Sequence, residues 1–346
     1  MQHRIIGWDV GGAHLKAACA EDGIITEAVL IPSPLWLGVG ELDRAFSEAE
    51  AAIGRAPVNA ITMTGELCDA FANRDEGVIG LAAIMTRLLG TKRVVFYAGR
   101  SGFVEEPEVA ANAARIASAN WHASAALTGL HARSALFIDM GSTTTDIIPI
   151  SKGEPANAGS TDAERLLHGE LVYSGLSRSF LMAGPKQVPF VGQWTPLMNE
   201  WFATTADVYR ILGQLPEGAD KMETADGREK TKAASCARLA RMIGQDSVAA
   251  DEAAWEGLAR FFAEAQLREI MDAAALILSR GLIPANAPLV GAGVGRGVVR
   301  KLAERLERHF LAFDDLIKAR PEARKRACDC APAAAVALLA AAQFPA

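Results

Sequence analysis

The chain has 346 residues, of which 50% are hydrophobic and 22% are charged, and its formal net charge at pH 7 is −6. This length is sufficient for two domains or for one large two-lobed unit with a sizeable core. With a pI near 5.6, the chain lacks the basic surface charge that nucleic-acid binding requires, so we expect no nucleic-acid partner.

The two ends of the chain bear on its location. The first residues pass directly into an apolar strand pattern without a cleavable signal sequence. The Ala-rich stretch 331–346 is too short to span a bilayer and predicts a packed helix. Five cysteines at scattered positions favour reduced thiols over a disulfide framework. We therefore expect a cytoplasmic protein with no membrane partner.

The first part of the chain alternates apolar strand patterns with helical patterns. The expected order is strand, strand, strand, helix, strand, helix, strand, helix, at residues 5–10, 15–21, 28–32, 41–54, 60–65, 77–90, 94–99 and about 107–126. The second part begins again with two strands separated by a short turn, at 135–141 and 145–151.

A region rich in Pro, Gly and aromatic residues follows these two strands. We expect it to form an insertion, or cap, over about 169–245. Helical patterns continue at 231–244 and 251–281, and a strand then enters a glycine-rich turn that leads into a helix at 298–310.

The most informative feature is a repeat of one short motif, at residues 5–16 and 136–146. In each copy an apolar strand runs into Asp-x-Gly, then small residues, then a charged side chain. The aligned pairs are Asp9 with Asp139, Gly11 with Gly141, and Lys16 with Asp146. Two copies, each at the head of a strand-rich half, indicate a duplicated domain that holds one phosphate group between its halves.

The residue types of the repeat suit phosphate binding. A strand followed at once by Gly and Ser or Thr makes a tight turn whose main-chain N–H groups point into one concavity, and Gly lets phosphate approach the backbone closely. An Asp at this place is suited to hold Mg²⁺ against the phosphates, which makes Asp9 and Asp139 the candidate metal ligands. The other candidate ligand-binding residues are Gly11, Gly12, His14, Gly141, Ser142, Thr143, Thr144 and Asp146.

The glycine turn at 291–297 has two interpretations. Gly291, Gly293 and Gly297 nearly spell a dinucleotide-binding fingerprint, and Asp314 lies at about the distance of its acidic residue. Such a fingerprint normally begins a domain, whereas fewer than sixty residues follow here. After two Asp-Gly hairpins, we favour a turn in which Gly291 and Gly293 pack against a nucleotide or a ligand of similar size.

Two phosphate hairpins followed by a late glycine motif resemble the superfamily of sugar kinases, actin and heat-shock chaperones. Within it, the string 139–146 is similar to the second hairpin of the hydantoinase A/oxoprolinase branch. The strings at 7–18, 63–67, 117–123 and 200–213 resemble a compact single-chain family linked to tetrahydromethanopterin-dependent one-carbon transfer, which includes a methanofuran-pathway synthase.

This resemblance implies an α/β fold, namely a two-lobed, duplicated actin-like (ribonuclease H-like) ATPase fold with a central cleft. The first lobe would comprise residues 1–134 and the second residues 135–346, with the cap as an insertion in the second lobe. Mg²⁺ is the implied cofactor. Whether ATP or a diphosphate of the substrate fills the cleft is left open.

The same resemblance implies a transferase that joins an aminomethylfuran diphosphate to the phenol of γ-glutamyltyramine and releases diphosphate. Its partners would be these two small molecules; the oligomeric state, including a homo-oligomer, is left open. Lys16 would stabilise the diphosphate. The phenol has a pKa of about 10, so the reaction needs a base. Glu66, His122 and Lys186 are candidates among which the sequence does not choose.

Other candidate residues lie near the cap. Asp207 is a candidate site residue, although the string Thr204–Asp207 also fits a helix N-cap. Several aromatic side chains are candidates to wall a pocket for the furan and phenol rings, namely Tyr173, Phe180, Phe190, Trp194, Trp201 and Tyr209.

Two other classes of function stay open at this stage. One is an ATP-dependent small-molecule kinase or a hydantoinase/oxoprolinase-type amidohydrolase of the same fold. The other is an ATP-switched interaction protein of the actin or chaperone kind, which requires larger partner surfaces than this chain offers.

Overall fold

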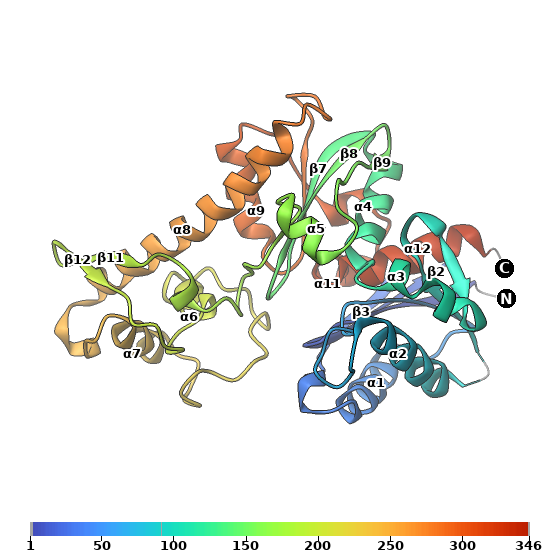
Figure 1. Ribbon diagram of the computed structural model, residues 1–346, viewed down its shortest axis with the longest axis horizontal. Helices are drawn as coiled ribbons and strands as arrows, with labels where there is room; N and C mark the ends of the chain where they lie inside the picture. The colour runs from blue at the N-terminus through green and yellow to red at the C-terminus, as the bar shows by residue number, and fades with distance from the viewer. Residues whose placement is uncertain (1–2, 91, 345–346) are drawn as a thin grey trace.

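The repeated hairpins each begin a mixed β-sheet in the computed structural model, which describes residues 3–90 and 92–344. The first sheet has the strand order β3-β2-β1-β4-β5-β6. The strands are β1 (Arg4–Val10), β2 (His14–Glu21), β3 (Ile24–Pro32), β4 (Val58–Met63), β5 (Arg93–Tyr97) and β6 (Phe103–Glu105). The helices α1 (Gly40–Ile53) and α2 (Arg74–Leu89) belong to this lobe, which Figure 1 shows in blue at the lower right.

The second sheet repeats the arrangement of the first. Its order is β10-β8-β7-β13-β14, with β9 paired to β8. The strands are β7 (Ser134–Met140), β8 (Thr145–Ser151), β9 (Glu154–Pro155), β10 (Leu171–Val172), β13 (Leu289–Ala292) and β14 (Phe310–Ala312). In both sheets an antiparallel hairpin lies beside a parallel strand, β4 next to β1 and β13 next to β7. The predicted two-lobed, duplicated actin-like α/β fold is thus confirmed.

The remaining helices connect and cover the sheets. They are α3 (Val109–Ile116), α4 (Asn120–His131), α5 (Asp162–Leu167), α8 (Glu252–Leu278), α9 (Arg296–Arg305), α10 (Phe313–Leu316), α11 (Pro321–Asp329) and α12 (Ala331–Gln343). Short 3-10 turns lie at Leu35–Leu37, Gly99–Ser101, Glu106–Glu108, Leu181–Ala183 and Ser247–Ala249.

The C-terminal helix α12 packs across the lobe boundary, on β1 and β2 of the first sheet and on α4, which covers the second sheet. The Ala-rich sequence of α12 makes this close packing feasible, and Gly7 of β1 completes it, since a Cβ there would overlap the backbone of Ala333. A hydrophobic core shared by both lobes results. The expected packed C-terminal helix is confirmed, while the boundary at residue 134 stays a prediction.

The expected helix over 107–126 is wrong in its continuity. The chain forms α3 and α4 with a break at Ser118, whose φ of 50° lies in the left-handed region. This break turns the Ser118 side chain toward the first lobe, where its hydroxyl donates to Glu66 Oε1 at 2.7 Å.

The cap extends from the second lobe and lies at the lower left in Figure 1. It contains β11 (Gln187–Phe190), β12 (Gln193–Pro196), α6 (Thr205–Ile211) and α7 (Lys232–Met242), packed on the N-terminal half of α8 around its own apolar core. Because β10 pairs with β8, Leu171 and Val172 belong to the second sheet, and the expected cap bounds of about 169–245 otherwise stay a prediction. None of the helices in the described part of the chain has the length and apolar character to cross a membrane.

Candidate functional site

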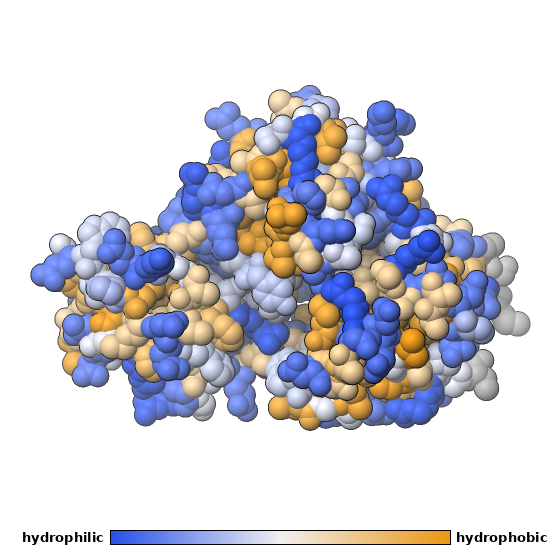
Figure 2. Space-filling view, viewed as in Figure 1, coloured by the Kyte–Doolittle hydropathy of each residue, from blue (hydrophilic) through white to orange (hydrophobic). Residues whose placement is uncertain are grey.

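Both turns of the repeated hairpins line one cleft between the lobes, with a volume of about 960 Å³. The first turn contributes residues 11–14 and the second residues 141–144. Figure 2 shows the hollow between the first lobe and the cap. The sequence-based expectation that the two hairpins converge on one pocket is therefore met.

The turns present main-chain donors to the cleft. Each turn is closed by one internal hydrogen bond, from Gly11 N–H to His14 O at 3.0 Å and from Gly141 N–H to Thr144 O at 2.9 Å. Within residues 3–90 and 92–344, no acceptor is found for the main-chain N–H groups of Gly12, Ala13, Ser142, Thr143 and Thr144. Two turns that line one cleft and carry main-chain donors without a described acceptor suit the binding of an anion.

Asp9 and Lys16 form an ion pair across the first hairpin. They stand opposite each other in the β1–β2 register, and Lys16 Nζ donates to Asp9 Oδ2 at 2.9 Å. Burial alone would lower the pKa of Lys16, but the charges of Asp9 and Asp139 outweigh it and raise that pKa. Lys16 therefore keeps its positive charge and lines the cleft, while Asp9 lies behind it with 1% of its surface exposed.

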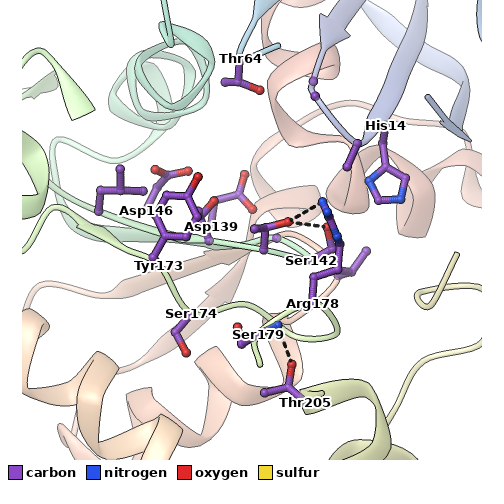
Figure 3. Close-up of a pocket in the computed structure, with 18 of the residues that line it drawn as sticks. His14, Thr64, Asp139, Ser142, Asp146, Tyr173, Ser174, Arg178, Ser179 and Thr205 are labelled. Atoms are coloured by element: carbon purple, nitrogen blue, oxygen red, sulfur yellow. Dashed lines mark hydrogen bonds between the residues drawn. The ribbon is translucent and has the colours of Figure 1, made fainter. Parts of the chain in front are cut away.

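The second hairpin places two carboxylates in the equivalent positions, because Asp139 stands opposite Asp146. Asp146 accepts from the buried Arg165 at 2.5 Å. The carboxylate of Asp139 accepts no hydrogen bond from any described residue, and it faces the cleft (Figure 3). Burial, opposed by the charge of Lys16 and reinforced by that of Asp146, raises the pKa of Asp139 to about 7.

The donor set of the cleft fits a hydrated Mg²⁺ better than a metal held by protein ligands alone. Among the described residues, no group of three or more His, Cys, Asp and Glu side chains is arranged to hold a metal. Mg²⁺ is commonly held by one or two carboxylates together with phosphate oxygens and water. Asp139 has its carboxylate free for this role, whereas one oxygen of Asp9 is engaged by Lys16.

Arg178 and Trp36 are cleft residues that the sequence analysis missed. Arg178 follows β10 in an irregular loop, and its NH1 donates to Thr143 Oγ1 at 3.2 Å. Its guanidinium lies over the ring of Trp36, with 5.1 Å between the guanidinium carbon and the ring centroid. Figure 3 shows Arg178 reaching toward the second turn, with His14 beyond it.

The candidate bases lie outside the residues that line the cleft. Glu66 is buried, and its burial raises its pKa. It accepts a hydrogen bond from Ser118, which itself lines the cleft. His122 is buried beside Tyr97, with 2.8 Å between its Nδ1 and the Tyr97 hydroxyl, and burial lowers the pKa of His122 to about 4. Lys186 is exposed on the cap. The structure thus connects only Glu66, of these three, to the cleft through a described hydrogen bond.

Asp207 takes part in the capping of α6. It accepts a hydrogen bond from Thr204 N–H at 3.1 Å. It also accepts from Ser235 Oγ and from Arg238 Nε, each at 2.8 Å. Asp207 thus stands at N3 of the capping box whose N-cap is Thr204, its side chain lies outside the cleft lining, and a catalytic role for it stays a prediction.

The aromatic candidates divide between the cleft and the cap. Tyr173 and Phe180 line the cleft. The others pack elsewhere: Phe190 against Trp255, Trp194 against Phe261, Trp201 against Phe180, and Tyr209 through its hydroxyl to Gln266.

The glycine turn packs against the second hairpin rather than lining the cleft. Gly293 has a φ of 81°, and a Cβ there would overlap Asp139 Oδ1 and the backbone of Met140. Gly291 is similarly enclosed by Phe310. Val294 of this turn reaches the cleft. Gly293 thus leaves the space that the Asp139 carboxylate occupies.

Comparison with known proteins finds a matching family and two named relatives. The family described as Hydantoinase/oxoprolinase matches residues 58–314. The (4-{4-[2-(gamma-L-glutamylamino)ethyl]phenoxymethyl}furan-2-yl)methanamine synthase of Methanocaldococcus jannaschii is 32% identical over 247 residues, covering 71% of this chain and 73% of that protein. The synthase of the same name from Methanococcus vannielii is 36% identical over 122 residues, covering 35% of this chain and 54% of that protein.

Two solved structures show similarity at lower identity. A nucleotide-free acetone carboxylase aligns with a TM-score of 0.49 and 12% identity, over 88% of this chain and 68% of that one. Component A of (R)-2-hydroxyglutaryl-CoA dehydratase from Acidaminococcus fermentans aligns with a TM-score of 0.43 and 15% identity, over 98% of this chain and 99% of that one.

Proposed function

This chain belongs to the hydantoinase/oxoprolinase family, and we propose that it is an enzyme of methanofuran-type cofactor biosynthesis, as its relatives named synthases are. The relatives' name describes a furan carbon joined through CH₂–O to a phenyl ring. In the proposed reaction, the phenol oxygen of γ-glutamyltyramine attacks the CH₂ carbon of an aminomethylfuran diphosphate. The new C–O bond forms, the bond from CH₂ to the diphosphate oxygen breaks, and diphosphate leaves with the electron pair.

The observation that carries this proposal is the double cradle of free main-chain N–H groups around Lys16. A departing diphosphate gains negative charge as the C–O bond breaks. Donors already fixed toward that charge stabilise the transition state because they need little reorganisation. The ion pair to Asp9 holds Lys16 charged and in place for this role.

Asp139 is the residue that would hold Mg²⁺ beside the diphosphate, with Asp9 behind Lys16 as its counterpart. When bound, Mg²⁺ would supply further neutralisation of the leaving group. The carboxylate of Asp139 is suited to this because no described residue donates to it.

The phenol proton requires an acceptor, and the pair of Ser118 and Glu66 provides one. Ser118 lines the cleft, and its hydroxyl lies 2.7 Å from Glu66 Oε1 and 3.2 Å from Asp162 Oδ2. In the proposed relay, Ser118 gives its own proton to Glu66 as it accepts the phenol proton. A buried carboxyl group with a raised pKa is better matched to this task than an exposed one. Replacing Glu66 by Gln should lower kcat and leave KM unchanged.

The ring-binding part of the cleft lies near Tyr173 and Phe180. Their exposed aromatic faces supply apolar surface for a furan and a phenol ring. Stacking would hold the attacking oxygen and the CH₂ carbon in line, which is the positioning that an alkyl transfer needs.

Incubation of the protein with aminomethylfuran diphosphate, γ-glutamyltyramine and Mg²⁺ tests the proposal. Mass spectrometry should detect the aryl ether and an equal amount of diphosphate without ATP. Parallel reactions contain the same three components together with ATP. An ether that forms only with ATP, or ADP release that depends on a second substrate, would favour the kinase or amidohydrolase alternative.

A further inference from the structure

The guanidinium of Arg178 faces the cleft without an acidic partner. Its described hydrogen bonds go to neutral oxygens, and no carboxylate of the described residues forms an ion pair with it. Half-buried cations in proteins are normally paired because burial of a lone charge is unfavourable. Burial lowers the pKa of Arg178, and the charge of Tyr173 acts in the opposite direction.

Arg178 and Trp36 are each fixed to one of the two hairpin turns. The main-chain N–H of Arg178 donates to Ser142 O at 2.9 Å, in the second turn. Trp36 lies in the 3-10 turn Leu35–Leu37. The first residue of this turn is held to the first hairpin turn, because Leu35 N–H donates to Gly12 O at 3.0 Å. The stacking of Arg178 on Trp36 therefore joins the two turns across the cleft.

Three positively charged side chains lie close enough to His14 to act on its pKa. Burial, followed by the positive charges of Lys16, Arg178 and Lys221, lowers the pKa of His14 to about 3. His14 is thus neutral at pH 7 and adds no charge to this region. Lys16 is paired with Asp9, whereas Arg178 has no acidic partner among the described residues and is available to an anion that enters the cleft.

We propose that Arg178 binds the outer phosphate group of the substrate's diphosphate and, by stacking on Trp36, holds the two lobes together around it. This inference rests on the proposed function and names a residue for the diphosphate beyond the turns and Lys16. The planar guanidinium presents paired donors that match two oxygens of a terminal phosphate. The hydrogen bond from Arg178 to Thr143 holds the guanidinium beside the second turn.

Titration calorimetry with inorganic diphosphate and Mg²⁺ tests the inference on the full chain. Arg178→Met removes the charge and Arg178→Lys keeps it without the fork. The matched control is Arg300→Met, because Arg300 also lies over an aromatic ring, 4.1 Å from the centroid of Phe310, on an exposed face outside the cleft. Thermal unfolding of each variant establishes that it is folded.

We expect the diphosphate Kd to rise at least about tenfold in Arg178→Met and by an intermediate factor in Arg178→Lys, with the control unchanged. A diphosphate Kd within about twofold of wild type in folded Arg178→Met would overturn the inference. L-Glutamate titrated in the same way probes the carboxylates of the acceptor. Weakened glutamate binding with unchanged diphosphate binding would also overturn it.

Tryptophan fluorescence tests the contact across the lobes. Diphosphate should change the emission of wild type, and this change should be lost in Trp36→Phe and in Arg178→Met. An unchanged response in Trp36→Phe would contradict the clamp. These binding measurements need no turnover. If the protein binds diphosphate through Arg178 but makes no ether, that result refutes the proposed function and leaves this inference standing. Normal ether synthesis with unaltered diphosphate binding in Arg178→Met refutes this inference alone.

Discussion

Asp139 and Asp146 stand opposite each other in the second hairpin at the positions that Asp9 and Lys16 occupy in the first. The duplicated fold thus places an ion pair in one hairpin and a carboxylate pair in the other. Arg165 neutralises Asp146, which leaves Asp139 as the carboxylate of this hairpin with no ion-pair partner among the described residues. The two halves have the same backbone plan and complementary charge, as expected for a site that binds a metal–phosphate complex.

Replacing Asp139 by Ala should reduce turnover by about 10²–10³-fold while leaving the fold intact, since the change removes stabilisation of the leaving group. Steady-state kinetics with saturating Mg²⁺ and far-UV circular dichroism check this. Asp314→Ala, remote from the cleft lining, serves as the control. Turnover that is unchanged in Asp139→Ala would remove Asp139 from the mechanism.

Replacing Arg165 by Met should destabilise the protein by about 3–5 kcal/mol, because Asp146, whose side chain is only 14% exposed, would lose its ion-pair partner. Arg165 also lies over Trp121, with 4.3 Å to the ring centroid, so some packing is lost as well. Urea unfolding measures the loss. The double variant Arg165→Met/Asp146→Asn should recover part of it, and equal instability of the single and double variants would contradict the charge argument.

His122 should make the protein sensitive to acid. Burial and the charge of Arg100 lower the pKa of His122 to about 4, so the folded state holds it neutral while the unfolded chain protonates near pH 6.5. The unfolded state then binds more protons, and the free energy of unfolding falls as the pH drops from about 6.5 to about 4. His122→Gln should flatten that fall in denaturant titrations at several pH values. Loss of turnover in the same variant at pH 7 would restore His122 as a candidate base.

Diphosphate should stabilise the protein more than ATP does. A ligand that binds only the folded state adds about 2.7 kcal/mol at 100 times its Kd. Thermal shifts with Mg-diphosphate should therefore exceed those with Mg-ATP at equal concentration. The opposite order would indicate that the cleft selects a nucleotide.

The sequence predicted the cradle because the repeated motif carries its own local geometry. A strand, an Asp, a Gly and small residues form the same turn wherever they occur, so residues 9–16 and 139–146 were recognisable without tertiary information. The helix start at Thr204–Asp207 was likewise predictable from the sequence, because a capping box is a local pattern.

Arg178 and Ser118 were not predictable in this way. Arg178 lies in an irregular loop, and only the return of the chain after β10 places it beside the second turn. Ser118 meets Glu66 from 52 positions away, through a helix break that the helical periodicity does not signal. Contacts of this kind depend on how the elements pack, which a single sequence does not encode locally.

The origin of the ether oxygen tests the central claim most directly. With ¹⁸O in the phenol of γ-glutamyltyramine and unlabelled aminomethylfuran diphosphate, mass spectrometry should find the label in the aryl ether and none in the released diphosphate. That result shows that the phenol oxygen attacks carbon and that diphosphate departs whole. Label in a phosphate product, or phosphorylated acceptor in place of the ether, would show attack at phosphorus and contradict the account.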